Sequence, residues 1–193
     1  MYVLYSPSDE KVFDDIRLLY RTKTTRKVEN CVSQRWFEEI SDQTLHYAQY
    51  RKFLQVAISQ DRLVGFALLF SSIIEIFEKD SAHVFEKARN FLFEQGYDFS
   101  TCFFLYHVVD EQYQEVFGGL VLNLINHARA KSILSLPHRV RSELGSYISH
   151  IIVLQHENVE LHFQLISYKF RLIGSIPMGR GRLPINVFAF STA

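Results

Sequence analysis

The stretch that decides the fold, Cys102 to Leu120, reads CFFLYHVVDEQYQEVFGGL. Its first part, Cys102 to Val109, is an almost unbroken run of apolar and aromatic residues, which predicts a buried strand. A polar turn follows, and the pair Gly118-Gly119 opens an amphipathic helix that extends to about Lys131. Such a junction directs unpaired backbone N–H groups and the positive end of a helix at one point, which suits an anion such as a pyrophosphate.

The composition predicts one globular domain that covers residues 1–193. The chain is 48% hydrophobic and 15% aromatic, which is enough for a substantial core, and no Pro/Gly/Ser-rich linker divides it. Lysine plus arginine and aspartate plus glutamate both number 21, so the formal net charge is zero. Because a nucleic-acid binder usually has a basic excess, we expect no nucleic-acid partner.

The cysteines, the amino terminus and the lengths of the apolar runs bear on cellular location and on metal binding. The two cysteines form no disulfide framework, and no metal-ligand spacing surrounds them, so we expect no metal. The amino terminus lacks the pattern of a signal peptide, and no apolar run approaches the ~18 residues of a membrane span. We therefore expect a soluble, cytoplasmic protein that does not associate with membranes.

Hydrophobic periodicity predicts an alternation of strands and helices along the chain. The predicted strands are 2–5, 53–59, 63–70, 102–109, 150–155, 172–178 and 183–190, and the predicted helices are 8–19, 33–47, 82–95, 118–131 and 159–170. Tight hairpins imply antiparallel pairing, and long helical crossovers imply parallel pairing. The predicted fold class is α/β, with a mixed, mostly antiparallel central sheet of about six to seven strands and helices on both faces.

Three short stretches carry a family resemblance. Residues 61–67 read DRLVGFA, residues 114–119 read QEVFGG, and residues 158–170 begin with Asn158 and end with Phe170. In this element order they resemble, respectively, the hairpin segment, the pyrophosphate loop (Q/R-x-x-G-x-G/A) and the last-helix pattern of the GCN5-related N-acetyltransferase (GNAT) superfamily. The resemblance covers nearly the whole chain and implies an acyl-CoA N-acyltransferase-like fold.

The chain departs from the family pattern at several positions. Phe117 stands in place of the first glycine of the loop, where we expect its ring to crowd a phosphate, and Lys169 and Leu161 replace a glycine and an alanine. Seven residues after its asparagine the family often has a tyrosine that protonates the departing thiolate. Leu165 occupies that position, and Tyr168 follows nearly one helical turn later.

The resemblance implies that acetyl-CoA, or another acyl-CoA, is the co-substrate. The coenzyme contacts that it implies are Val108, Val109, Gln114, Gly118, Gly119 and Asn158. In this family the central strand splays from its neighbour, so the backbone from Tyr106 to Val109 would pair with the pantetheine arm by strand addition. Tyr168 is the candidate acid.

A general base would have to accept the proton of the acceptor amine near the middle of the sheet. His107 and Asp110 flank that place, and the ordinary imidazole pKa of about 6.5 suits neutral pH, so His107 is the candidate base. Structural alternatives stand beside these roles: His107 as a strand residue bonded to a backbone carbonyl, Tyr168 as packing, Asn158 as a helix cap, and QEVFGG as an ordinary turn.

The predicted function is acyl-CoA-dependent N-acyltransfer, in which a small-molecule or peptide amine attacks acetyl-CoA directly. One alternative is a fold relative that has lost catalysis and serves as a binding or regulatory module, as the residues at 117, 165 and 169 suggest. Another is transfer of a longer acyl chain, because the many Phe and Tyr residues could line an apolar tunnel.

Overall fold

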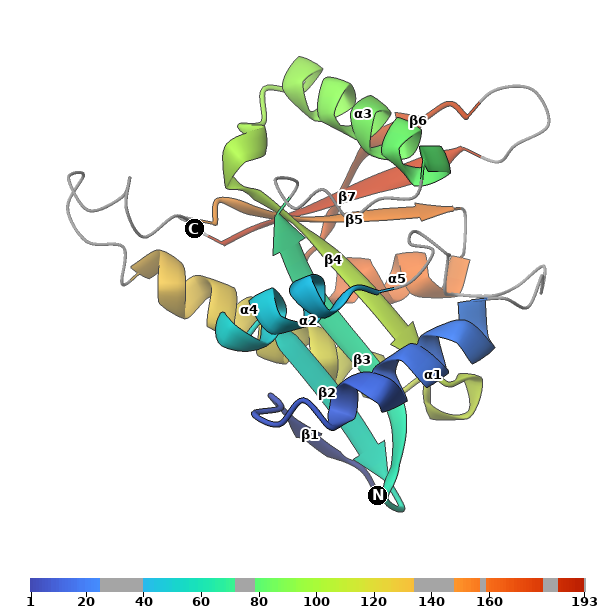
Figure 1. Cartoon of the computed structure of the whole chain (residues 1–193). Coiled ribbons are helices and arrows are strands. Elements are labelled where there is room, and N and C mark those ends of the chain that lie inside the picture. Colours follow the sequence, from blue (N-terminus) through green and yellow to red (C-terminus); the bar gives the residue numbers. More distant parts are fainter. Residues whose placement is uncertain (25–39, 72–78, 134–147, 157–158, 179–183, 193) are drawn as a thin grey trace.

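A computed structural model places seven strands in one sheet, in the order β1-β2-β3-β4-β5-β7-β6 (Figure 1). The structure describes residues 1–24, 40–71, 79–133, 148–156, 159–178 and 184–192. The strands are β1 (Val3–Tyr5), β2 (Leu54–Ser59), β3 (Arg62–Ser71), β4 (Cys102–Val109), β5 (His150–His156), β6 (Arg171–Ile176) and β7 (Ile185–Ser191). The helices are α1 (Val12–Thr24), α2 (Asp42–Tyr50), α3 (Lys79–Glu94), α4 (Val116–Ile133) and α5 (Val159–Ser167), with short 3-10 turns η1 (Phe99–Thr101) and η2 (Glu111–Tyr113).

The sheet is mixed, as predicted. Its neighbouring strands pair antiparallel except β4 and β5, which are parallel because α4 carries the chain back between them. The β2–β3 hairpin turns on Gln60 and Asp61, whose φ angles of 50° and 58° match the primed turns that favour tight hairpins. The predicted α/β class with helices on both faces is therefore confirmed.

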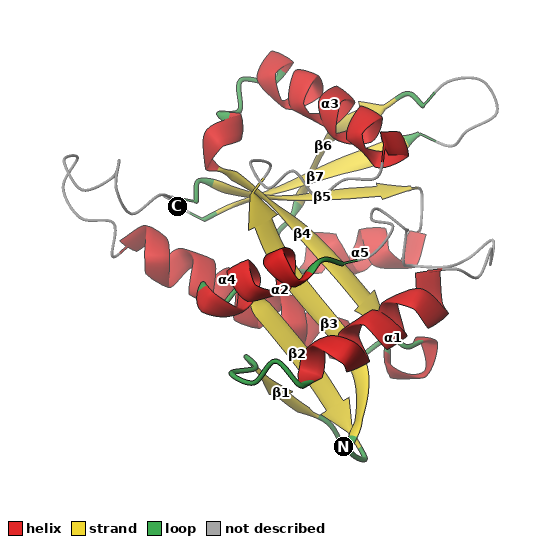
Figure 2. Ribbon diagram, viewed as in Figure 1, coloured by secondary structure: helices red, strands yellow, loops and turns green. Residues whose placement is uncertain are grey.

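The helices form a layer on each face of the sheet (Figure 2). Successive side chains of β4 point to opposite faces. On one face Tyr106 contacts Tyr20 of α1, with ring centroids 6.1 Å apart, and Phe104 contacts Phe85 of α3 at 5.3 Å. On the other face His107 contacts Phe117 of α4 at 4.6 Å. Helices α1, α2 and α3 thus cover one face, and α4 and α5 cover the other.

Four helix starts differ from the prediction: α1 begins at Val12 and α3 at Lys79, and the starts of α2 and α4 also differ. Helix α2 begins at Asp42, where the Ser41 hydroxyl accepts a hydrogen bond from the Thr44 N–H at 3.2 Å and so caps the helix. The first residues of the predicted 33–47 helix lie outside the described residues. Helix α4 begins at Val116, before the glycine pair, because Val116 and Phe117 both bury their side chains in the core.

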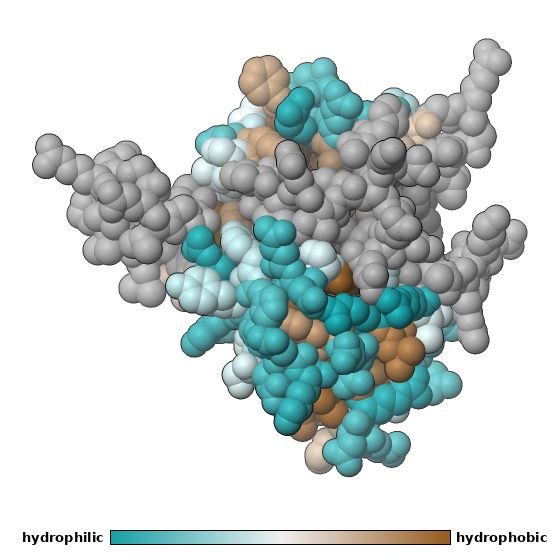
Figure 3. Space-filling model, in the orientation of Figure 1, coloured by the Kyte–Doolittle hydropathy of each residue, from teal (hydrophilic) through white to brown (hydrophobic). Residues whose placement is uncertain are grey.

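Polar side chains cover much of the described surface over α1 and α2, with smaller apolar areas between them (Figure 3). Helices in the described part of the chain are all too short or too polar to cross a membrane.

Candidate functional site

Strands β4 and β5 part within the sheet. Their pairing is limited to three residue pairs, from Cys102↔His150 to Phe104↔Ile152, although β4 continues to Val109. Beyond Phe104 the two strands diverge, which is visible in Figure 1. The structure therefore has the splayed central strand that the family resemblance implies, with a gap in the strand pairing beside the carboxyl-terminal half of β4.

The register of β4 decides which backbone groups face this gap. The N–H of Asp110 donates to the carbonyl of Val64 at 2.8 Å, so this pair is a hydrogen-bonded pair of the antiparallel ladder. Because such pairs alternate, Val108 presents its N–H and C=O to β3, while His107 and Val109 present theirs to the gap. Of the two valines expected to contact the coenzyme, only Val109 has its backbone directed into the gap.

The His107 side chain is buried beneath α4. It is 7% exposed, its ring lies 4.6 Å from that of Phe117, and its Nε2 has no hydrogen-bond partner among the described residues. Burial lowers the pKa of His107 to about 4. A general base works best when its pKa is near the operating pH, so this environment does not favour the predicted base role.

Phe117 does not crowd the loop as we expected. Its side chain is 2% exposed and lies between α4 and the sheet, because the helix has already begun at Val116 and turns position 117 inward. The N–H of Phe117 donates to the carbonyl of the half-buried Gln114 at 3.1 Å. The first turn of α4 is therefore not covered by this ring.

Gly118 and Gly119 both allow a close approach of another side chain. A Cβ on Gly118 would lie 2.7 Å from Cζ of Tyr168 and closer still to its hydroxyl, and a Cβ on Gly119 would collide with Leu4 of β1. Packing within the protein thus accounts for both glycines. Their contact with a phosphate stays a prediction.

Tyr168 is held at the end of α5 by a helix-terminating turn. Lys169 has a left-handed φ of 67°, and the N–H of Phe170 donates to the carbonyl of Leu165 at 3.0 Å. Leu165 is fully buried, so the position where the family often has its tyrosine belongs to the core. The half-buried Tyr168 instead contacts Phe117, with ring centroids 6.3 Å apart.

An ion cluster at the end of β4 was not foreseen. The Asp110 carboxylate, in a residue 4% exposed, accepts hydrogen bonds from Lys23 Nζ at 3.1 Å, Arg62 Nη2 at 3.0 Å and the Gln112 N–H at 3.3 Å. Burial raises the pKa of Asp110. The hydrogen bonds from Lys23 and Gln112, together with the positive charges of Lys23 and Arg62, lower the pKa by more than burial raises it, so the pKa is below its usual value. Asp110 therefore stays ionised and joins α1, the start of β3 and the segment that leads into α4.

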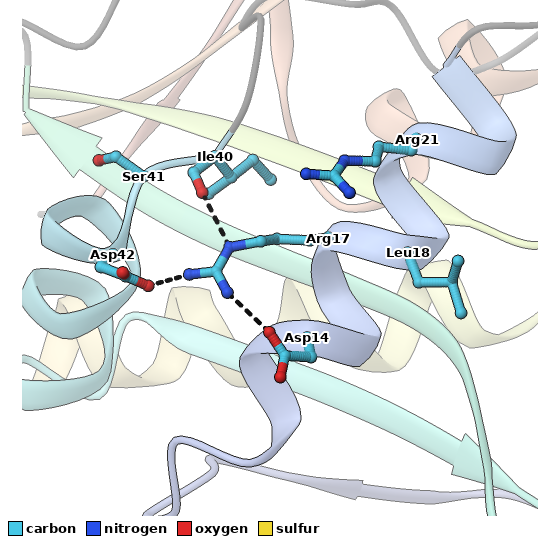
Figure 4. Close-up of a pocket in the computed structure, with 7 residues that line it drawn as sticks. All are labelled: Asp14, Arg17, Leu18, Arg21, Ile40, Ser41 and Asp42. Carbon is cyan, nitrogen blue, oxygen red and sulfur yellow. Dashed lines mark hydrogen bonds and ion pairs between the residues drawn. The ribbon is translucent and has the colours of Figure 1, made fainter.

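A hollow lies elsewhere, between α1 and the start of α2 (Figure 4). It has a volume of about 650 Å³ and is lined by Asp14, Arg17, Leu18, Arg21, Ile40, Ser41 and Asp42. Arg17 forms ion pairs with Asp14, at 2.9 Å, and with Asp42, and its Nε donates to the carbonyl of Ile40 at 3.4 Å. These contacts neutralise the guanidinium of Arg17.

Two further predicted coenzyme contacts are Asn158 and Gln114. Asn158 lies outside the described residues. Glu111 and Glu115, on either side of Gln114, are exposed near the start of α4. Within the described ranges, no group of three or more His, Cys, Asp or Glu side chains could hold a metal ion.

Comparison with known proteins shows the fold. The sequence matches no protein-family model and no curated protein. The yncA protein of Salmonella typhimurium, solved with its cofactor acetyl-CoA, superposes with a TM-score of 0.62 at 12% identity, over 100% of this chain and 94% of that one. A ribosomal-protein-alanine N-acetyltransferase from Brucella melitensis gives 0.61 at 15% identity, over 98% and 99%. A GNAT-family acetyltransferase from Streptococcus pneumoniae gives 0.59 at 10% identity, over 99% of each chain. This chain therefore has the fold of the GNAT acetyltransferases.

Proposed function

We propose that the protein is an acyl-CoA-dependent N-acyltransferase that transfers an acetyl group to a small-molecule or peptide amine. The observation that carries the proposal is the carboxyl-terminal part of β4, which pairs with no described strand on its β5 side and where His107 and Val109 direct their backbone groups away from β3. An extended amide-containing chain can pair with such an edge as an added strand. The fold shared with acetyltransferases makes the pantetheine arm of coenzyme A the best candidate for that chain.

The residues around the gap fit an acyl-CoA in part. The backbone of His107 and Val109 would hold the arm, and the first turn of α4, which begins at Val116, offers N–H groups to a diphosphate. The exposed carboxylates of Glu111 and Glu115 near that turn oppose a diphosphate. We therefore expect binding that relies more on the strand edge than on the phosphate loop.

The coenzyme supplies an acyl group activated as a thioester, and the protein supplies position and polarity. When the amine and the thioester are both bound beside β4, their bimolecular reaction becomes an effectively unimolecular reaction within the complex. The hydroxyl of Tyr168, which lies beside the first turn of α4, is the candidate donor of a proton to the departing thiolate. Neither His107 nor Asp110 has a pKa near neutrality, so we assign neither as the base.

A binding or regulatory module is the second candidate. It is favoured by the acidic side chains near the start of α4 and by the burial of Leu165 where the family often has its tyrosine. Such a module would bind acyl-CoA without turnover.

Two measurements test the proposal. Coenzyme A is titrated into the protein by calorimetry, and thiol release from acetyl-CoA is followed with a panel of amines. Saturable binding with amine-dependent release supports the transferase, binding without release supports the module, and no heat at millimolar coenzyme contradicts both. A comparison of acetyl and long-chain thioesters identifies the acyl group.

A backbone variant links the binding to the strand edge. Val109→Pro removes an N–H that faces the gap, whereas Val108→Pro removes one that pairs with β3. We expect Val109→Pro to remain folded and to bind coenzyme A at least about ten-fold more weakly, since a lost hydrogen bond and a crowded edge both act on the ligand. Val108→Pro should instead lower the melting temperature.

A further inference from the structure

We propose that the His107 side chain is a hydrogen-bond donor to the acyl carbonyl of the bound thioester, and that it acts as a neutral imidazole. This inference rests on the proposed function and assigns to the same site a group that polarises the reacting carbonyl.

The first observation is a buried nitrogen without a partner. Nε2 of His107 is buried and makes no hydrogen bond within the described part of the chain. Buried polar atoms are nearly always hydrogen-bonded, and an exception calls for a ligand, a water or a functional role. Nε2 of His107 therefore has hydrogen-bonding capacity that a bound molecule could use.

The second observation is the place of His107 on the strand. It lies two residues before Val109 on the part of β4 that has no pairing with β5, and its own backbone groups face the gap. Its side chain points to the α4 face, where the aromatic ring of Phe117 covers it and Tyr168 follows beyond that ring. A thioester that pairs with the backbone of His107 is thus brought to the imidazole of the same residue.

The third observation concerns the charge of the ring. Opposite His107 on β3 is Ala67, and above it is Phe117, so both of these neighbours are apolar. Such surroundings disfavour the imidazolium and keep the ring neutral at physiological pH. A neutral imidazole donates from one nitrogen only, and a donor fixed in a dry site stabilises the negative charge that develops on a carbonyl oxygen under attack.

The role differs from that of a general base in what it predicts. A base would take a proton from the amine, so the turnover rate would fall as the pH drops below the pKa of the imidazole. A neutral donor to the carbonyl makes acetyl-CoA bind more tightly than coenzyme A, because only acetyl-CoA has the thioester carbonyl oxygen that accepts the hydrogen bond. It also weakens the carbonyl bond, which lowers the vibrational frequency of that bond.

The test compares the two ligands on three proteins. Acetyl-CoA and coenzyme A are titrated into the wild type, His107→Gln and His107→Leu by calorimetry, and the carbonyl stretch of carbon-13-labelled acetyl-CoA is recorded by infrared difference spectroscopy. In the wild type we expect acetyl-CoA to bind about five-fold more tightly than coenzyme A, as one net hydrogen bond provides, with a lowered carbonyl frequency. His107→Gln, which keeps an N–H donor, should retain part of both effects, and His107→Leu should lose both.

Each other outcome has a definite meaning. If His107→Leu keeps the wild-type affinity ratio and carbonyl frequency, or weakens both ligands equally, the donor role is overturned while the proposed function stands. If the wild type binds neither ligand, the proposed function fails and the donor role fails with it.

Discussion

The Tyr168 hydroxyl lies directly against Gly118 in the first turn of α4, so close that a Cβ on Gly118 would be 2.7 Å from Cζ of the tyrosine. The contact joins the end of α5 to the start of α4 beside the gap between β4 and β5. It gives Gly118 a structural reason that is independent of any phosphate, and it fixes the position of the candidate acid.

We expect Gly118→Ala to have opposite effects in two backgrounds. With Tyr168 present the new methyl group overpacks the contact and lowers the free energy of unfolding by about 1 kcal/mol. In a Tyr168→Ala background the collision is removed. The higher helix propensity of alanine at position 118 should then raise the free energy of unfolding by up to about 1 kcal/mol. Urea denaturation of the four proteins measures the coupling.

Gly119→Ala is the matched control for that cycle. Its methyl group would meet Leu4, not Tyr168, so its effect should be the same in both backgrounds. An equal effect of Gly118→Ala in both backgrounds would show that Tyr168 does not lie where the structure places it.

Lys169→Gly should stabilise the protein. Lys169 is exposed and has a φ of 67°, a conformation that costs a residue with a Cβ about 1 kcal/mol and costs glycine almost nothing. For a chain of this length that gain raises the melting temperature by about 2–4 °C. Lys169→Ala keeps the strained conformation and is the control, so an equal rise in both variants would point to the lysine charge as the cause.

Asp110→Asn should lower the free energy of unfolding by about 2 kcal/mol at neutral pH, because it removes the charge that Lys23 and Arg62 share. The pKa of Asp110 is below its usual 3.8 in the folded state, so its contribution is complete above that pH and is lost as the pH falls through the folded pKa. The difference between wild type and variant should therefore be constant from pH 5 to 7 and shrink below pH 4. A difference that stays constant into strong acid would contradict the ion cluster.

His107 should make the fold less stable in mild acid. Its pKa is lowered by burial from 6.5 to about 4, so as the pH falls the unfolded chain takes up a proton before the folded one does. The free energy of unfolding should therefore fall below pH 6.5 by about 1.4 kcal/mol per pH unit and level off near pH 4. His107→Gln should lack this part of the slope, and denaturation curves at pH 7, 6 and 5 compare the two proteins.

The order of elements could be predicted from the sequence because its signals are local. Short, mostly apolar runs mark β2 and β3, and the tight turn between them fixes their antiparallel pairing. The apolar run of β4, followed by α4 and the next apolar run, marks the parallel pair. The parting of β4 from β5 was implied by the family resemblance alone.

The interior of the site could not be predicted, because it depends on contacts between residues distant in sequence. Lys23 and Asp110 are 87 positions apart, and no local pattern links them. Phe117 stands where the family has the first glycine of its loop, which predicts that its ring crowds the loop, but a helix start at Val116 turns the ring into the core. Gly118 suggested a phosphate contact, and only the fold brings Tyr168 to it.

Hydrogen exchange at single amides of β4 tests the central claim most directly. In the free protein the amides of Tyr106 and Val108 pair with β3 and should exchange slowly, while those of His107 and Val109 face the gap and should exchange faster. On addition of saturating acetyl-CoA, we predict that His107 and Val109 become protected and that Tyr106 and Val108 change little. If acetyl-CoA binds and leaves the exchange of His107 and Val109 unchanged, the ligand does not lie along this strand and the account is contradicted.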